Sequence, residues 1–169
     1  MKILVVNSSA FPKSVVENMC IQFEGAALNI DIQTQRINLF ADMPPICDGT
    51  YTFKGEFSEL QKLVLSYDGL FIGTPCHWFN MPAVLKNFID HLTPIDSFLW
   101  KKSRPLCLAV YAPEGGEFGV LSSIILPFNL MGFSLPANGF AYYNGNDRWA
   151  YDEIKEMPKR MLEIADLSL

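Results

Sequence analysis

Three short segments of the chain are apolar at nearly every position. They are KILVVN (residues 2–7), the core of DGLFIGT (residues 68–74) and PLCLAVY (residues 105–111). A strand with one face in water alternates polar and apolar residues, whereas a continuous apolar run suits a strand covered on both faces. Longer amphipathic segments separate these runs, so buried strands alternate with helices along the chain. This alternation predicts a parallel sheet with helices packed on both of its faces.

Two further segments extend the predicted sheet. Residues 29–39 alternate apolar and polar side chains, which suits an edge or near-edge strand. Residues 133–143 predict a strand that is interrupted at Pro136 and at Asn138-Gly139. We therefore expect residues 1–169 to form a single α/β domain, a three-layer sandwich around a five-stranded parallel sheet of order 2-1-3-4-5.

The helices of this domain are expected in the segments between the strands. Apolar positions recur at helical spacing from Ser14, over residues 57–67, from Met81 and over residues 118–132. Ser14 suits an N-cap, and Gly132 suits the end of its helix. A last helix from about Asp152 contains Pro158, which is expected to kink or split it.

Composition and charge exclude several classes of protein. The net charge is −5 and no face gathers Lys and Arg, which argues against nucleic-acid binding. The four cysteines, Cys20, Cys47, Cys76 and Cys107, form no C-x-x-C pair, so no metal site is expected and the thiols suit a reducing compartment. The first apolar run is too short for a signal peptide, and no run is long enough to span a bilayer. We therefore expect a cytoplasmic protein without a membrane partner.

The first of three unusual loops, NSSAFPKS (residues 7–14), joins a buried strand to a helix N-terminus. Free backbone N–H groups and the helix dipole favour an anion at such a corner. Ser8, Ser9 and Ser14 add hydroxyl groups and Lys13 adds a positive charge. A phosphate monoester fits this loop, but so does an ordinary capped turn with solvated serines. The sequence contains neither G-x-x-x-x-G-K-[ST] nor G-x-G-x-x-G, which argues against a nucleoside triphosphate or a dinucleotide site.

The second loop, GTPCHWFNMP (residues 73–82), follows the third strand. Trp78 and Phe79 offer flat apolar faces on which an aromatic ligand can stack. Asn80 and the N–H groups near Met81 can bind the edge of a ring. An alternative is that the two aromatic side chains belong to the core or to an interface.

Two further residues of this loop carry chemical groups. The imidazole of His77 can donate, accept or carry charge near neutral pH, although a satisfied surface histidine is the more common case. Cys76 has no second cysteine nearby and is expected to act as a small apolar residue.

The third loop, APEGGEFG (residues 112–119), follows the fourth strand. Gly115 and Gly116 allow the backbone to approach a ligand closely. Glu114 and Glu117 lie in or just before the first turn of the next helix, where negative charge is favourable. An exposed turn with acidic residues at a helix start explains this segment equally well.

The predicted strand order brings these loops to one place. Ligands of such sheets bind beyond the carboxyl ends of the strands, at the point where the strand order reverses. A phosphate at the first loop, an aromatic ring at the second and a close backbone approach at the third describe a mononucleotide with a flat ring. Flavin mononucleotide, FMN, is the natural candidate.

These segments resemble a known family, the flavodoxin-like NAD(P)H-dependent FMN reductases. The match is most specific over DGLFIGTPCHWFNMPAVLKNFIDHL (residues 68–92), which follows the family's strand–loop–helix pattern. The first loop resembles the family's G-S-x-R-x-x-S phosphate motif, with Ser9 and Ser14 at the serine positions. Ser8 replaces the glycine of that motif and Phe11 replaces its arginine, while His77 replaces the commoner tyrosine beside Trp78.

The resemblance implies a flavodoxin-like fold, FMN as cofactor and NADH or NADPH as co-substrate. It implies an oxidoreductase that passes electrons to a small acceptor such as a quinone or a flavin, with His77 a candidate to stabilise charge on the reduced flavin. The residues that it assigns to the cofactor are Ser9, Phe11, Lys13, Ser14 and Val15 in the first loop, Pro75, Cys76, His77, Trp78, Phe79, Asn80 and Met81 in the second, and Pro113, Glu114, Gly115 and Gly116 in the third.

Two alternatives stay open at the level of the sequence. One is a flavodoxin-type electron carrier, which shares the fold and FMN but does not oxidise a nicotinamide. The other is an interaction protein of the same fold that binds no flavin.

A homodimer is also expected. Phe98, Leu99 and Trp100 form an apolar cluster that water would not favour, and the resembling family is commonly dimeric. We expect Trp100 at or near the interface.

Overall fold

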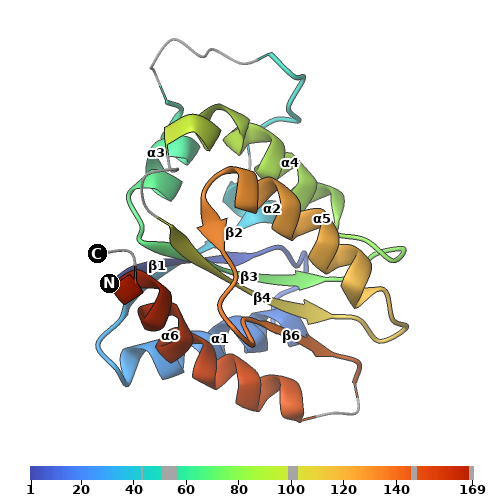
Figure 1. Ribbon diagram of the computed structural model, residues 1–169. Helices are drawn as coiled ribbons and strands as arrows, with labels where there is room; N and C mark the ends of the chain where they lie inside the picture. The colour runs from blue at the N-terminus through green and yellow to red at the C-terminus, as the bar shows by residue number, and fades with distance from the viewer. Residues whose placement is uncertain (43, 51–56, 99–102, 146–147, 168–169) are drawn as a thin grey trace.

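A parallel sheet runs through the middle of the molecule in the computed structural model, which describes residues 1–42, 44–50, 57–98, 103–145 and 148–167 (Figure 1). Its strands are β1 (Lys2–Asn7), β2 (Gln33–Asn38), β3 (Gly69–Pro75), β4 (Arg104–Tyr111), β5 (Phe133–Ser134) and β6 (Phe140–Tyr143). The strand order is β2-β1-β3-β4-β5, with β6 also paired to β4. Every pair is parallel, so the predicted order and direction of the strands are confirmed.

Two predicted strands have different bounds in the structure. The segment 133–143 forms two short strands, β5 and β6, because Pro136 and Gly139 close a turn through the Gly139 N–H and the Pro136 carbonyl at 2.9 Å. The edge strand β2 begins at Gln33 rather than at residue 29. Residues 29–32 instead end the preceding helix, since the N–H of Ile32 donates to the carbonyl of Ala27 at 3.0 Å.

Helices cover both faces of the sheet (Figure 1). They are α1 (Val15–Leu28), α2 (Leu39–Asp42), α3 (Glu59–Leu65), α4 (Ala83–Leu92), α5 (Glu117–Leu130) and α6 (Trp149–Leu167), with a 3₁₀ helix over Thr93–Phe98. Helices α1 and α6 lie on one face, and α4 and α5 lie on the other (Figure 1). The short helix α2 follows β2 directly.

The predicted ends of the helices are correct at some residues and wrong at others. Ser14 caps α1 as predicted, and Gly132 follows the C-cap of α5 with a φ of 90°. The last helix begins at Trp149 and is not split, because α6 continues through Pro158 to Leu167. Pro82 is the N-cap of α4.

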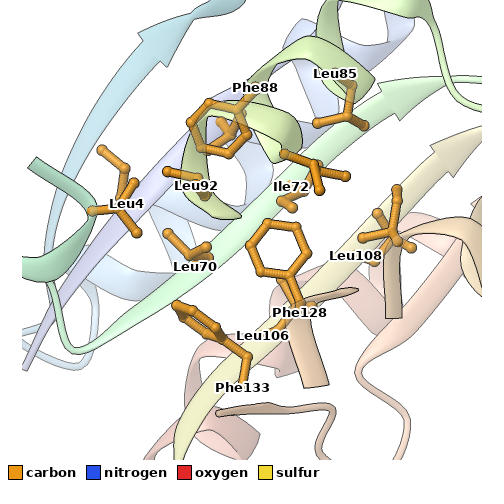
Figure 2. Close-up of a cluster of buried hydrophobic side chains, with 14 of the residues drawn as sticks. Leu4, Leu70, Ile72, Leu85, Phe88, Leu92, Leu106, Leu108, Phe128 and Phe133 are labelled. Carbon is orange, nitrogen blue, oxygen red and sulfur yellow. The ribbon is translucent and has the colours of Figure 1, made fainter. Parts of the chain in front are cut away.

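Successive residues of the central strands point to opposite faces and fill two separate cores. Leu4 and Val6 of β1 join one core, while Ile3 and Val5 join the other, and all four are fully buried. Figure 2 shows the first core, in which side chains of α4 and α5 cover Leu70, Ile72, Leu106 and Leu108 of the sheet. In the second core the rings of Phe23 and Phe71 stack with their centroids 4.1 Å apart.

The carboxyl ends of the strands are joined by hydrogen bonds that position the three loops. The N–H and the hydroxyl of Ser8 both donate to the carbonyl of Gly73, at 3.0 and 3.2 Å. The N–H of Cys76 donates to the Tyr111 carbonyl at 2.8 Å. Ser8 stands where the family motif has a glycine. Its buried hydroxyl, which a glycine would lack, bonds the first loop to the end of β3. Within the described residues, no helix is both long and apolar enough to cross a membrane.

Candidate functional site

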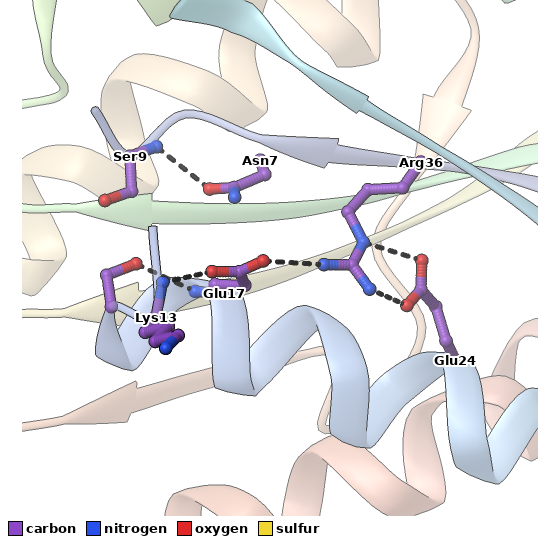
Figure 3. Close-up of polar contacts among 7 residues, drawn as sticks. Asn7, Ser9, Lys13, Glu17, Glu24 and Arg36 are labelled. Carbon is purple, nitrogen blue, oxygen red and sulfur yellow. Dashed lines mark hydrogen bonds and ion pairs between the residues drawn. The ribbon is translucent and has the colours of Figure 1, made fainter. Parts of the chain in front are cut away.

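The first loop is ordered by its own side chains. The N–H of Ser9 donates to Oδ1 of Asn7 at 2.9 Å (Figure 3). The N–H of Phe11 donates to Oγ of Ser9 at 3.3 Å. Ser9 is buried, whereas Phe11 is 73% exposed. The loop therefore has a fixed backbone below an aromatic side chain that faces solvent.

The start of α1 retains several backbone donors. The hydroxyl of Ser14 accepts from the N–H of Glu17 at 3.1 Å and so caps the helix. The N–H groups of Ser14, Val15 and Val16 find no acceptor among the described residues. Free N–H groups at the positive end of a helix dipole favour an anion. Lys13 lies beside them with an exposed side chain and a φ of 58°.

An acidic residue that sequence reasoning did not single out contacts this corner. The carboxylate of Glu17 accepts a hydrogen bond from the Lys13 N–H (Figure 3). Its other oxygen lies 3.5 Å from Nη1 of Arg36, and Arg36 also holds Glu24 through two hydrogen bonds. The pattern Ser14-x-x-Glu17 is a signal that would have found this residue, because it is the sequence of a capping box.

The second loop folds into a tight hairpin at its centre. The N–H of His77 donates to the Asn80 carbonyl at 2.8 Å, and the N–H of Asn80 donates to the His77 carbonyl at 3.0 Å. The central residues, Trp78 and Phe79, have φ values of 47° and 60°, as in a type I′ turn. Bulky residues rarely adopt this conformation, and each costs roughly 1–3 kcal/mol there. The strained turn displays two aromatic rings, with 94% of Trp78 and 60% of Phe79 exposed.

Two glycines at the start of α5 allow the third loop to pack against this hairpin. A Cβ on Gly119 would lie 2.3 Å from the carbonyl oxygen of Phe79. A Cβ on Gly116, which has a φ of 93°, would lie 2.6 Å from Cα of Phe79 and 2.9 Å from the sulfur of Cys76. Sequence reasoning chose Gly115 and Gly116 but missed Gly119, whose contact joins residues 40 positions apart and leaves no local pattern.

A cavity of about 450 Å³ lies between the second and third loops. Its lining residues are Cys76, His77, Trp78, Phe79, Pro113, Glu114 and Gly115. A volume of this size falls within the range of roughly 300–1,000 Å³ that is usual for small-molecule sites. Partial burial raises the pKa of the Cys76 thiol, so this thiol is protonated near neutral pH and is a poor nucleophile.

Most of the predicted residues of the second and third loops are thus brought together. The exceptions are Pro75, Asn80, Met81 and Gly116, which adjoin the lining residues in sequence but do not line the cavity. The N–H of Met81 already donates to Oδ1 of Asn80 at 2.7 Å. The predicted residues of the first loop, Ser9 to Val15, do not line this cavity and form the separate corner at the start of α1.

The fold and the site together define a class of protein. A parallel sheet of order β2-β1-β3-β4-β5, with loops gathered beyond the carboxyl ends of its strands, is the flavodoxin-like arrangement. The sequence matches the NADPH-dependent FMN reductase family over residues 1–146, and the chain belongs to this family. The protein is accordingly an FMN-dependent oxidoreductase that uses NAD(P)H. No curated protein matches its sequence.

Solved structures share the fold at low sequence identity. RosB, solved with the bound intermediate 8-demethyl-8-formylriboflavin-5'-phosphate, has a TM-score of 0.76 and 16% identity, over 99% of this chain and 79% of that chain. An oxidoreductase from Corynebacterium diphtheriae has a TM-score of 0.74 and 16% identity, over 100% and 99%. An FMN-dependent NADH-azoreductase from Bacillus anthracis, in complex with FMN, has a TM-score of 0.70 and 18% identity, over 95% and 99%.

The contact between Gly119 and Phe79 gives a testable prediction. Gly119→Ala is expected to lower the free energy of unfolding by about 1–3 kcal/mol, because the new methyl group overlaps the Phe79 carbonyl. Gly25→Ala is the matched control, since Gly25 also lies inside a helix but has no atom within 4 Å of the added Cβ. This control should gain up to about 1 kcal/mol from helix propensity. Urea unfolding of both variants measures the difference, and equal changes would contradict the packing described.

Proposed function

We propose that FMN lies across the carboxyl ends of the strands, with its phosphate on residues 9–15 and its ring in the cavity between the second and third loops. The observation that carries this proposal is the cavity itself, which is lined by Trp78 and Phe79 and closed by the turn at Pro113 to Gly115. The single domain predicted from the sequence, residues 1–169, is part of the same proposal.

The donor set at each end supports this position. The free N–H groups of Ser14, Val15 and Val16 and the ammonium group of Lys13 suit a phosphate dianion. The exposed rings of Phe11, Trp78 and Phe79 suit a flat aromatic ring, which would remove apolar surface from water. The residues present therefore fit the cofactor of the family.

In this proposal the residues of the chain bind and orient the cofactor. When bound, FMN supplies the redox chemistry, which is hydride transfer from a reduced nicotinamide and transfer of electrons to an acceptor. The hairpin at His77 to Asn80 fixes the plane against which a ring stacks. His77 lines the cavity, and its proposed role is to stabilise negative charge at the edge of the reduced ring.

The proposed reaction is the reduction of a small acceptor at the expense of NADH or NADPH. We propose a quinone, a free flavin or a similar compound as acceptor, and the name of the Bacillus anthracis azoreductase adds azo compounds to this class. The cavity supports such acceptors because two exposed aromatic side chains, Trp78 and Phe79, line it.

Anaerobic mixing of the FMN-loaded protein with NADH and with NADPH tests this function. The flavin absorbance near its visible maximum is expected to bleach with at least one nicotinamide, and added quinone should restore it. Loss of His77 in His77→Ala should shift the reduction potential of the flavin if the proposed charge stabilisation is correct. A protein that takes up FMN but oxidises neither nicotinamide would be an electron carrier instead, and one that takes up no FMN would contradict the proposal.

The strained turn gives a second prediction. Trp78→Asn should raise the free energy of unfolding by about 1 kcal/mol, because Asn tolerates a positive φ and the exposed Trp78 ring has little packing to lose. The same change should weaken FMN binding by up to about tenfold, the value of one aromatic stacking contact. Trp78→Phe keeps a ring at the same backbone position and should retain most of the affinity without a gain in stability. Thermal unfolding and flavin fluorescence quenching measure both effects; an unchanged FMN affinity in Trp78→Asn would contradict the stacking role.

We propose that the protein is a homodimer. The side chains of Phe98 to Trp100, from which the sequence predicts an interface, lie outside the described part of the chain. A second apolar surface supports association: Phe118, Leu126 and Leu130 of α5 are exposed, and residues 118–146 contain no Asp, Glu, Lys or Arg. Two copies of a chain with a net charge of −5 repel each other least through such an uncharged face.

Sedimentation at micromolar concentration tests the dimer. The wild-type protein is expected to sediment as a dimer, and Leu126→Glu, which places a charge on the exposed face of α5, should shift it toward the monomer. A wild-type monomer would contradict the proposed association. A dimer that Leu126→Glu leaves intact would place the interface elsewhere, as the sequence-based prediction at Trp100 does.

A further inference from the structure

Glu17 places a negative charge at the corner that is proposed to hold the FMN phosphate. Its carboxylate accepts the Lys13 N–H, and Lys13 belongs to the segment 9–15 (Figure 3). We propose that Glu17 competes with the flavin phosphate for this corner, lowers the affinity for FMN specifically and thereby makes FMN an exchangeable ligand. The inference rests on the proposed position of the phosphate.

The competition follows from charge and from the number of donors. A phosphate monoester carries a charge of about −1.5 to −2 near pH 7, so it is repelled by a carboxylate that lies beside its site. One N–H group also cannot donate fully to the carboxylate and to a phosphate oxygen at the same time. The phosphate must therefore either displace the Glu17 carboxylate from the Lys13 N–H or bind without that donor.

Arg36 provides a position to which the displaced carboxylate can move. Its Nη1 lies 3.5 Å from Oε1 of Glu17, longer than a hydrogen bond, while Nε and Nη2 are already held by Glu24. A small rotation of the Glu17 side chain would shorten the contact with Arg36 as the contact with Lys13 is lost. Glu17 and Arg36 are only partly exposed, with 29% and 28% of their side chains accessible, so the pair is not fully screened by water.

The same contact has a use when no flavin is bound. A carboxylate in the first turn complements the positive end of the α1 dipole and satisfies the Lys13 N–H. Glu17 thus substitutes for the phosphate in the flavin-free protein and keeps the corner ordered. A corner whose Lys13 N–H already has an acceptor releases FMN more readily than one in which that donor is also without a partner.

Titration of the flavin-free full-length protein with FMN and with riboflavin tests this inference. Fluorescence quenching gives the Kd of each ligand, and riboflavin has the same ring but no phosphate. Glu17→Gln removes the charge and keeps the size of the side chain. It is expected to tighten FMN binding by about tenfold, which corresponds to about 1.4 kcal/mol, and to leave the Kd of riboflavin unchanged.

Glu24→Gln is the matched control. Glu24 binds the same Arg36 and carries the same charge, but it lies seven residues further along α1, roughly 10 Å along the helix axis. At 0.1 M salt this separation is about one Debye length, so its charge should be largely screened from the phosphate. Glu24→Gln is therefore expected to change the Kd of FMN by less than about twofold. The gain in Glu17→Gln should also shrink when the salt concentration is raised.

Each outcome of these titrations decides between causes. An unchanged or weaker affinity for FMN in Glu17→Gln would show that Glu17 only supports the helix start, and would overturn the inference. Equal tightening of FMN and riboflavin, or equal tightening in both variants, would also overturn it, because the effect would not be tied to the phosphate at this corner. Failure of the wild-type protein to bind either ligand would contradict the proposed flavin site itself, a result distinct from a failure of Glu17 alone.

Discussion

Burial of both faces of the central strands is the constraint on which the rest of this structure depends. Ile3 to Val6 of β1 and Leu70 to Ile72 of β3 are fully buried, and their side chains alternate between two cores. Each core requires its own layer of helices, and parallel neighbours require a helix to return the chain to the start of the sheet. All the loops that follow strands are then gathered at one edge. The position of the site therefore follows from the burial of the strands alone, whatever residues its loops contain.

The sequence predicts the parts of the fold that rest on local pattern. The apolar runs at β1, β3 and β4 give the buried strands, and Ser14 gives the start of α1. The predicted start of β2 and a split of α6 at Pro158 were wrong, because the N–H of Ile32 closes α1 and α6 packs on the sheet, and neither contact is visible in the local pattern. For the same reason the sequence indicates the loops of the site but not Gly119, whose role depends on a backbone oxygen of a distant residue.

The role of Glu17 is only partly predictable from the sequence. The pattern Ser14-x-x-Glu17 predicts that the glutamate reaches back to the helix start. It does not predict that the Glu17 carboxylate accepts from the N–H of Lys13 instead of the N–H of Ser14. Nor does it predict that Arg36 of β2 lies beside Glu17. Those contacts require β2 to pack beside α1, which only the assembled fold provides. Local sequence thus gives the residue, and the fold gives its partners.

The two ends of the proposed flavin site hold their ligand by opposite physical means. At the ring end, Trp78 and Phe79 are held in an unfavourable backbone conformation with their faces in water, so a ligand gains binding energy by covering them. At the phosphate end, part of the donor set is already satisfied by a carboxylate of the chain, so the gain from a new anion is smaller. In the proposed site, Glu17 would thus weaken the hold on the phosphate without changing the contacts of the ring. That division suits an enzyme whose cofactor belongs to the same chemical class as one of its proposed acceptors, because a free flavin can then enter the site that a bound flavin vacates.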